Sequence, residues 1–154
     1  MSRRQGRLPV AMLGVAVIFS LPGTPVCAQD PGPMEVVITM PSGHTAKAFD
    51  LVWDEDQSVI RPRYIVEELS YPASAYANNV FAVFDDMLWL CNTQIRNLFA
   101  PDELPQSQGW EGAIITMMSA PLDFGTRDPD VIQFFESFLF AEDGCALDDD
   151  EYHD

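Results

Sequence analysis

Two cysteines constrain the possible folds of this chain more than any other feature of its sequence. The chain has three cysteines, and Cys27 lies in an N-terminal segment that we expect to be removed. Cys91 and Cys145 remain, and an even number of cysteines in an exported protein is typical of a disulfide. Their bond would close a loop of about 54 residues, for which the chain-entropy model predicts about 4 kcal/mol of stabilisation. We therefore predict a Cys91–Cys145 disulfide, since a metal pair or a reactive thiol would need partners that the nearby sequence lacks.

Export is predicted from residues 1–28. Three arginines precede an apolar run over residues 8–21, and small residues lead up to Ala28. Positive, apolar and cleavable regions in this order are typical of a signal peptide that is cut after Ala28. The apolar run is shorter than the roughly 20 residues of a membrane-spanning helix, so we expect no stable membrane span after cleavage. Gln5-Gly6 does not fit the apolar pair of a twin-arginine signal. We therefore expect a Sec-type route to the periplasm or the medium.

The region after residue 28 is strongly acidic. All 24 acidic residues of the chain lie there with five of its eight basic residues, which gives a net charge of −19. This charge repels nucleic acid and anionic lipid. The negative charge favours solubility and the binding of cations or of a basic partner. We therefore expect the partner to be a protein or a small molecule. The five basic residues are Lys47, Arg61, Arg63, Arg96 and Arg127.

We divide this acidic region into three parts. Residues 29–34 form a flexible lead that is rich in proline and glycine, and residues 35–147 form a single α+β domain. Residues 148–154 form an acidic tail whose composition is typical of disorder.

The first half of the domain predicts strands and then a helix. Strand patterns at residues 35–40, 46–53 and 58–69 are separated by short turns, which indicates an antiparallel meander. Pro62 lacks a backbone donor, so we expect the third strand to lie at a sheet edge or to start late. An apolar stripe at helical spacing over residues 80–99 then predicts one long helix. Asn78 or Asn79 is expected to cap this helix, and Pro101 to end it.

The second half predicts further strands and a short helix. Residues 113–118 read as a buried strand, and residues 137–147 as a final, interrupted strand. Asp128-Pro129 is a favourable helix start and predicts a short helix over residues 131–136, although helix and strand both fit residues 134–140. We therefore expect an α+β fold: an antiparallel sheet of four to five strands, one long helix packed on a face, and one short helix near the C-terminus.

The sequence contains no recognisable catalytic, metal-binding or cofactor-binding motif. The Gly-rich phosphate loop, the nucleophile elbow and the paired-histidine zinc motif are all missing, and His44 stands alone in a predicted turn. We therefore predict no catalytic residues, no metal and no cofactor. Trp110, between two glycines, and Trp89, off the main helical stripe, are the candidates for contact with a partner.

Several short segments occur in an order and spacing that resemble a family of small exported bacterial proteins of unknown function. The resemblance spans about residues 36–147, and the chain departs from the family after Cys145. Some family members carry an acetolactate synthase label. The residues here do not support it, because a thiamine-diphosphate enzyme needs several hundred residues and works in the cytoplasm. The segments are Met40-Pro41-Ser42-Gly43, Asp50-Leu51-Val52-Trp53, Asp85-Asp86-Met87, Leu90-Cys91-Asn92-Thr93, Phe124-Gly125 with Asp130, Gln133-Phe134-Phe135-Glu136 and Glu142-Asp143-Gly144-Cys145.

These observations favour a non-enzymatic periplasmic binding or accessory module. One alternative is a small hydrolase-like enzyme that uses paired carboxylates, with Asp85, Asp86 and Glu136 as candidates; these would have to converge in a cleft. The other alternative is an acidic inhibitor that covers a basic partner.

Overall fold

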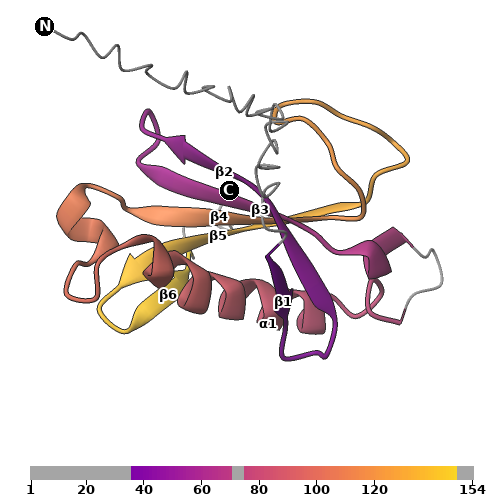
Figure 1. The fold of residues 1–154 in the computed structure, drawn as a ribbon, viewed down its shortest axis with the longest axis horizontal. Helices are drawn as coiled ribbons and strands as arrows, with labels where there is room; N and C mark the ends of the chain where they lie inside the picture. The colour runs from indigo at the N-terminus through magenta and orange to yellow at the C-terminus, as the bar shows by residue number, and fades with distance from the viewer. Residues whose placement is uncertain (1–35, 71–74, 149–154) are drawn as a thin grey trace, which may run out of the picture. The chain divides into compact units, whose positions relative to one another are not determined.

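One mixed sheet and one main helix make up the described part of the protein (Figure 1). The structure, a computed structural model, describes residues 36–70 and 75–148; the predicted signal peptide, the flexible lead and the tail beyond Asp148 lie outside them. The sheet has six strands in the order β1-β2-β3-β4-β5-β6. They are β1 (Val37–Thr39), β2 (Thr45–Asp54), β3 (Val59–Ile65), β4 (Gly112–Met118), β5 (Gln133–Ala141) and β6 (Gly144–Leu147).

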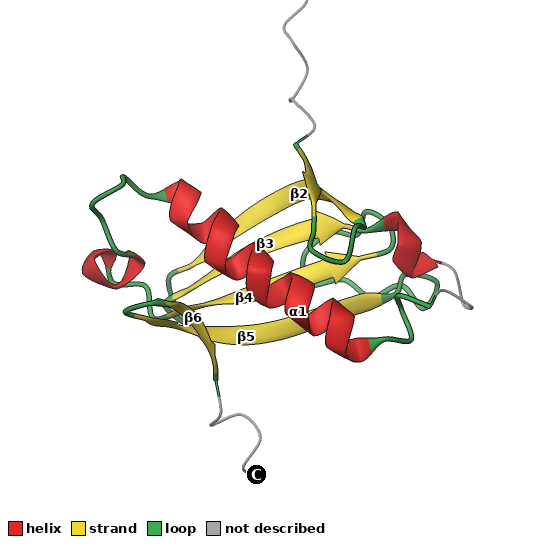
Figure 2. Cartoon of the chain, turned by 90° about the horizontal axis from the view of Figure 1, so that it is seen from below, coloured by secondary structure: helices red, strands yellow, loops and turns green. Residues whose placement is uncertain are grey.

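The chain crosses one face of the sheet between β3 and β4. These two strands are parallel, whereas every other neighbouring pair is antiparallel. A parallel pair needs a long connection, and this one contains α1 (Val80–Leu90), which lies diagonally across the sheet (Figure 2). A π-helical turn (Cys91–Ile95) and a 3₁₀ turn (Arg96–Leu98) extend the helix before Pro101. Two more 3₁₀ turns are Glu67–Ser70 and Pro105–Gln108.

The local signals for α1 act as the sequence predicts. The side chain of Asn79 accepts a hydrogen bond from the backbone N–H of Ala82 at 3.2 Å, so Asn79 caps the helix. Val83, Met87 and Leu90 recur at helical spacing and are buried in the core. On the sheet side, Ala113, Ile115 and Met117 of β4 belong to the same core. Because side chains alternate along a strand, Ile114 and Thr116 point to the opposite face.

The predicted antiparallel sheet of four to five strands with a short C-terminal helix is wrong. The sheet is mixed, because the helical connection brings β4 beside β3 in the same direction. It has six strands, because Glu142 and Asp143 form a tight turn that splits the last predicted strand into β5 and β6. Pro62 also lies inside the sheet rather than at its edge; the pairing of β3 with β4 skips Pro62, which cannot donate a hydrogen bond.

The residues predicted as the short helix instead form a turn and the start of β5. The N–H of Asp130 bonds to Oδ1 of Asp128 at 2.9 Å, and the N–H of Val131 bonds to the Asp128 carbonyl at 3.2 Å. Aspartate and proline favour turns as well as helix starts. From Gln133 onward the chain is rich in aromatic residues, which favour a strand, and it pairs with β4.

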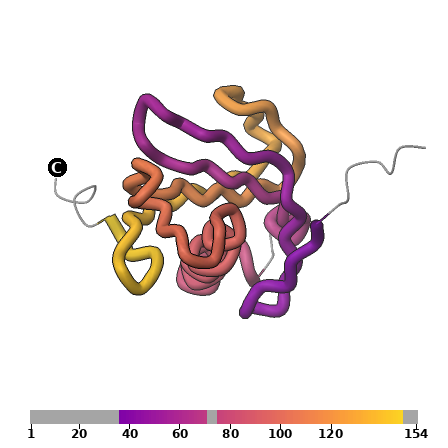
Figure 3. Tube along the Cα trace, turned by 60° about the vertical axis from the view of Figure 1, so that its left-hand side comes forward, coloured from indigo at the N-terminus to yellow at the C-terminus, as the bar shows by residue number. Residues whose placement is uncertain are grey.

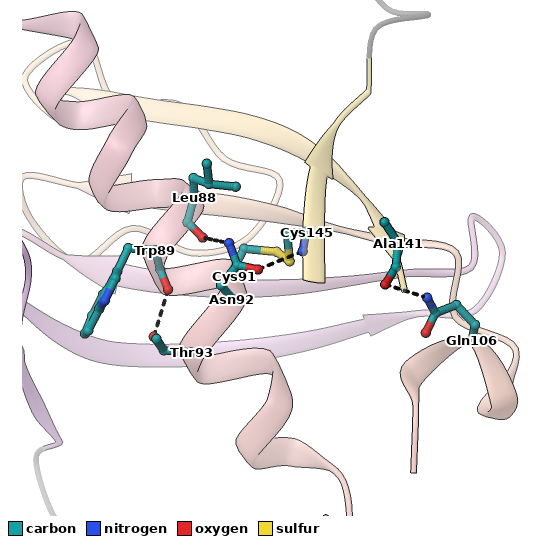
Figure 4. Close-up of a disulfide and its surroundings, with 8 residues drawn as sticks. All are labelled: Leu88, Trp89, Cys91, Asn92, Thr93, Gln106, Ala141 and Cys145. Carbon is teal, nitrogen blue, oxygen red and sulfur yellow. Dashed lines mark hydrogen bonds between the residues drawn. A yellow bond between two sulfur atoms is a disulfide. The ribbon is translucent and has the colours of Figure 1, made fainter. Parts of the chain in front are cut away.

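A disulfide between Cys91 and Cys145 joins the end of α1 to the edge hairpin of β5 and β6 (Figure 4). Their Cα atoms are 6.1 Å apart. Asn92 supports the same junction, because its Oδ1 accepts a hydrogen bond from the N–H of Cys145 at 2.8 Å and its Nδ2 donates to the Leu88 carbonyl at 3.0 Å. This is the cysteine pair that the sequence indicates.

Removing this crosslink is expected to destabilise the domain strongly. Replacing both cysteines with alanine (C91A/C145A) should lower the free energy of unfolding by about 2–4 kcal/mol, because the unfolded chain regains its loop entropy. Urea denaturation of the mature protein measures the change. Dithiothreitol should lower the stability of the wild type by a similar amount and leave the double variant unchanged. A double variant as stable as the oxidised wild type would contradict the prediction.

Gly144 is required by the close approach of Asn92. Its φ is +135°, and a Cβ there would lie 2.1 Å from Oδ1 of Asn92, whereas Gly109 (φ +90°) has open space around the same position. Gly109→Ala should therefore cost only the backbone penalty, about 1–2 kcal/mol. Gly144→Ala should cost at least about 1 kcal/mol more, because its φ lies farther from the left-handed region that other residues adopt and because a Cβ there also disrupts the Asn92–Cys145 hydrogen bond. Urea denaturation of both variants tests this, and equal losses would contradict the requirement for glycine at position 144.

Candidate functional site

The sheet face that α1 leaves uncovered carries a groove of about 630 Å³. Its floor comes from alternate residues of β3, β4 and β5, and one wall comes from the connection between β4 and β5. That connection and the β2–β3 hairpin both lie on the side of the sheet away from α1 (Figure 3). The floor residues are Arg61, Arg63, Ile114, Thr116, Phe135 and Ser137, and the wall residues include Phe124 and Arg127. A volume of this size suits a small ligand.

Arg63 holds the wall of the groove against the sheet. Its side chain is only 4% exposed, and Nη1 lies 2.7 Å from Oδ2 of Asp50. Nη2 donates to the carbonyl of Leu122 in the β4–β5 connection. The guanidinium also lies 5.5 Å from the ring centre of Phe49 and 5.7 Å from that of Phe124, a cation–π arrangement. Arg63 therefore has a structural role and is not available to a ligand.

Arg61 and Arg127 are the cationic groups that remain accessible in the groove. Arg61 uses Nε to bond Oδ2 of Asp54 at 2.8 Å and Nη2 to bond Oε1 of Gln57 at 2.9 Å. These contacts leave the donors on Nη1 unused. Arg127 is exposed and forms no ion pair with any residue that the structure describes. The lining of the groove thus contains one partly neutralised guanidinium group, that of Arg61, and one without an ion-pair partner among the described residues, that of Arg127.

Two exposed aromatic rings line the same groove. Phe124 is 55% exposed and Phe135 is 62% exposed, although phenylalanine side chains are usually buried. Phe124 lies over Arg61, with 5.9 Å between the guanidinium carbon and the ring centre. The groove therefore presents apolar faces next to hydrogen-bond donors, which is the usual composition of a small-molecule site.

The sequence patterns do not predict this groove. Arg61 and Arg63 are two residues apart on a predicted strand, so their side chains must lie on the same face of the sheet. This spacing is the one sequence signal for the groove. Arg127 and Phe124 lie some 60 residues away in a connection that no periodicity describes. Only the folded chain brings them to β3.

The two tryptophans proposed for partner contact lie elsewhere. Trp110 is half-buried, and its ring centre lies 5.1 Å from the ring centre of Trp53. The ring centre of Trp53 in turn lies 6.1 Å from that of Phe99. Trp89 is half-buried on α1 and packs against the core. Neither lines the groove, and a role in partner binding stays a prediction for both.

The carboxylates proposed for the enzyme alternative are not arranged as a pair. Asp86 is 1% exposed and accepts hydrogen bonds from the N–H of Ser42 at 3.1 Å, the hydroxyl of Ser42 at 2.5 Å and the hydroxyl of Tyr76 at 2.7 Å. Asp85, the preceding residue of α1, is exposed to solvent. Glu136 lies in β5, opposite Ile115 of β4. Asp86 therefore anchors the β1–β2 turn to α1, and nothing in this arrangement activates a water molecule.

His44 lies next to this network but does not complete a catalytic relay. Its ring packs against that of Tyr76, tilted by 41° with 4.2 Å between ring centres, and Nδ1 lies 3.8 Å from Oε1 of Glu68. A relay would place the imidazole between Ser42 and a carboxylate, but here Ser42 bonds directly to Asp86. In the described residues, no cluster of three or more His, Cys, Asp or Glu is placed to hold a metal ion. No helix there is long and apolar enough to cross a membrane.

Tyr76 makes the contribution of this network to stability sensitive to alkaline pH. Burial raises the pKa of Tyr76, and the hydrogen bond to Asp86 raises it further. Burial alone raises the pKa of Tyr64. The folded state thus favours the protonated phenols, so their contribution to stability is present below about pH 10 and is lost as the pH rises beyond it.

Tyr76→Phe should cost about 1–3 kcal/mol at pH 7, because buried Asp86 loses one donor. It should also reduce the loss of stability above about pH 10, since one of the two buried phenols is removed. Tyr64→Phe is the matched control: it should reduce the alkaline loss as well, but cost less at pH 7 because Asp86 keeps its partners. Urea denaturation at pH 7 and pH 11 measures both effects. Equal costs at pH 7 would contradict a role for the Tyr76 hydroxyl.

A protein-family model matches most of the chain. No curated protein and no solved structure is significantly similar to the chain. The model of a family of unknown function, DUF6497, matches residues 23–149. This match covers the whole described sheet, the helix and the groove. The chain therefore belongs to the DUF6497 family.

Proposed function

We propose that the protein is an exported, non-enzymatic binding module and that the groove on the uncovered sheet face is its binding site. The main observation in support of the proposal is the groove itself, which has a volume of about 630 Å³ and is lined by accessible Arg61 and Arg127 and by exposed Phe124 and Phe135. Sites built on strands are more precise than sites built on loops alone. The clamp of Arg63 fixes the one wall that comes from a loop.

A binding role suits the chemistry better than a catalytic one. The most buried carboxylate, Asp86, is used to hold the β1–β2 turn, and the histidine beside it does not contact the serine hydroxyl through its ring. The groove contains neither histidine nor cysteine among its lining residues. The hydrolase-like alternative, with Asp85, Asp86 and Glu136, therefore has no geometric support.

Two features support export. Disulfides persist in oxidising compartments and are rare in the cytosol, and Cys91 and Cys145 form one. Residues 1–28 have the pattern of a signal peptide. Both features support a periplasmic or secreted location.

Export predicts the mass of the mature chain. Protein isolated from the cells that naturally make it should begin at Gln29 and show the mass of an intramolecular disulfide, which is lower than that of the dithiol form by two hydrogen atoms. Intact-mass measurement before and after reduction tests both points. A chain that retains residues 1–28, or that carries two free thiols, would contradict export.

The binding role predicts a bound molecule in the native protein. Native mass spectrometry of the wild type from its own envelope fraction should show a small non-covalent adduct. Ser137→Trp fills the floor of the groove and should abolish the adduct, because a bulky side chain there takes the ligand's space. Gln108→Trp, on an exposed 3₁₀ turn outside the groove, should retain it. A wild type without an adduct, or an adduct that survives Ser137→Trp, would overturn the proposal.

A further inference from the structure

We infer that the ligand of this groove is a small organic anion with an aromatic or aliphatic body, an inference that rests on the proposed binding role. Its carboxylate, sulfonate or phosphate group would contact Arg61 and Arg127. Its apolar body would lie on Phe124 and Phe135.

The distribution of charge favours an anion here and disfavours it elsewhere on the protein. Residues 29–154 carry 24 acidic and five basic residues. The groove lining contains three of those five basic residues, Arg61, Arg63 and Arg127, and two acidic residues, Asp123 and Glu136. Asp54 and Asp50 pair with Arg61 and Arg63, so Arg127 is the one cation of the lining without an acidic partner among the described residues. The net negative charge of the protein repels an anion, and the guanidinium group of Arg127 makes this repulsion weaker in the groove than elsewhere on the surface.

The two accessible arginines differ in what they contribute. Asp54 already neutralises much of the charge of Arg61, and the pair is well formed at 2.8 Å. Arg61 can therefore supply directional hydrogen bonds from Nη1 but little net charge. Arg127 has no acidic partner among the described residues, so it should supply most of the attraction for the anionic group.

The exposed rings define the rest of the ligand. Phe124 and Phe135 face a groove that also contains Thr116 and Ser137 as neutral polar groups. Burying an apolar body against two such rings is favourable at about 25 cal/mol per Å². A purely charged molecule such as inorganic phosphate would leave both rings exposed, and a purely apolar one would leave Arg127 unused.

Two fluorescent probes separate the anionic contact from the apolar one. 8-Anilinonaphthalene-1-sulfonate combines an aromatic body with one negative charge, and N-phenyl-1-naphthylamine has nearly the same body without the charge. Titration of each into the mature oxidised protein, with calorimetry to establish one site per chain, gives both dissociation constants. We expect Arg127→Gln to weaken the sulfonate probe about tenfold or more and the neutral probe less than about twofold, as the loss of one charged hydrogen bond implies.

Arg96→Gln is the matched control, because it changes the net charge equally at an exposed site outside the groove. It should leave both dissociation constants unchanged. Phe135→Ser should weaken both probes by similar factors, because it removes a shared apolar contact. Removing residues 150–154 should change neither; a tenfold gain for the sulfonate probe would mean that the acidic end of the chain occupies the groove, and would overturn the inference.

The outcomes distinguish this inference from the proposed function. If Phe135→Ser and Ser137→Trp weaken both probes while Arg127→Gln affects neither, the groove is a binding site but its ligand is not an anion. If none of the groove variants affects either probe, the groove is not the binding site and both proposals fail.

Discussion

The parallel pairing of β3 with β4 organises the rest of the structure. A parallel pair cannot be closed by a tight turn, so the chain must leave the sheet after β3 and return along one face. That return contains α1, which buries Val83, Met87 and Leu90 against the inward side chains of β4. One face of the sheet becomes the core. The other face keeps Arg61, Arg63 and Thr116 and becomes the floor of the groove.

α1 is attached at two points to distant parts of the sheet. Within the helix, Asp86 receives three hydrogen bonds from Ser42 and Tyr76, and the two from Ser42 fix the β1–β2 turn. At its end, the Cys91–Cys145 bond and the Asn92–Cys145 hydrogen bond fix the β5–β6 hairpin. The helix therefore ties the two outer hairpins of the sheet together. A frame held at both edges can keep the floor of the groove rigid, and a rigid floor lowers the entropy lost on binding.

Several segments through which the chain resembles its family turn out to be parts of this frame. Ser42 of one segment meets Asp86 of another, and Cys91 and Asn92 meet Cys145. Asp50 and Phe124 both contact Arg63. By contrast, Arg61 and Arg127 lie outside those segments. The resemblance thus describes how the domain is held together more than what it binds.

The sequence alone was sufficient for features that depend on neighbouring residues or on residue type. Asn79 caps α1, the 3.6-residue spacing places Met87 in the core, and the cysteine pair bonds, because each follows from local geometry or from a simple count. The mixed sheet, the six strands and the turn at Asp128 were decided by tertiary structure, since the same local signals fit two conformations and pairing with β4 selects one. The groove depends on tertiary structure most of all, because Phe124 reaches Arg61, and Arg127 joins the lining, only when a long connection folds back across the uncovered face.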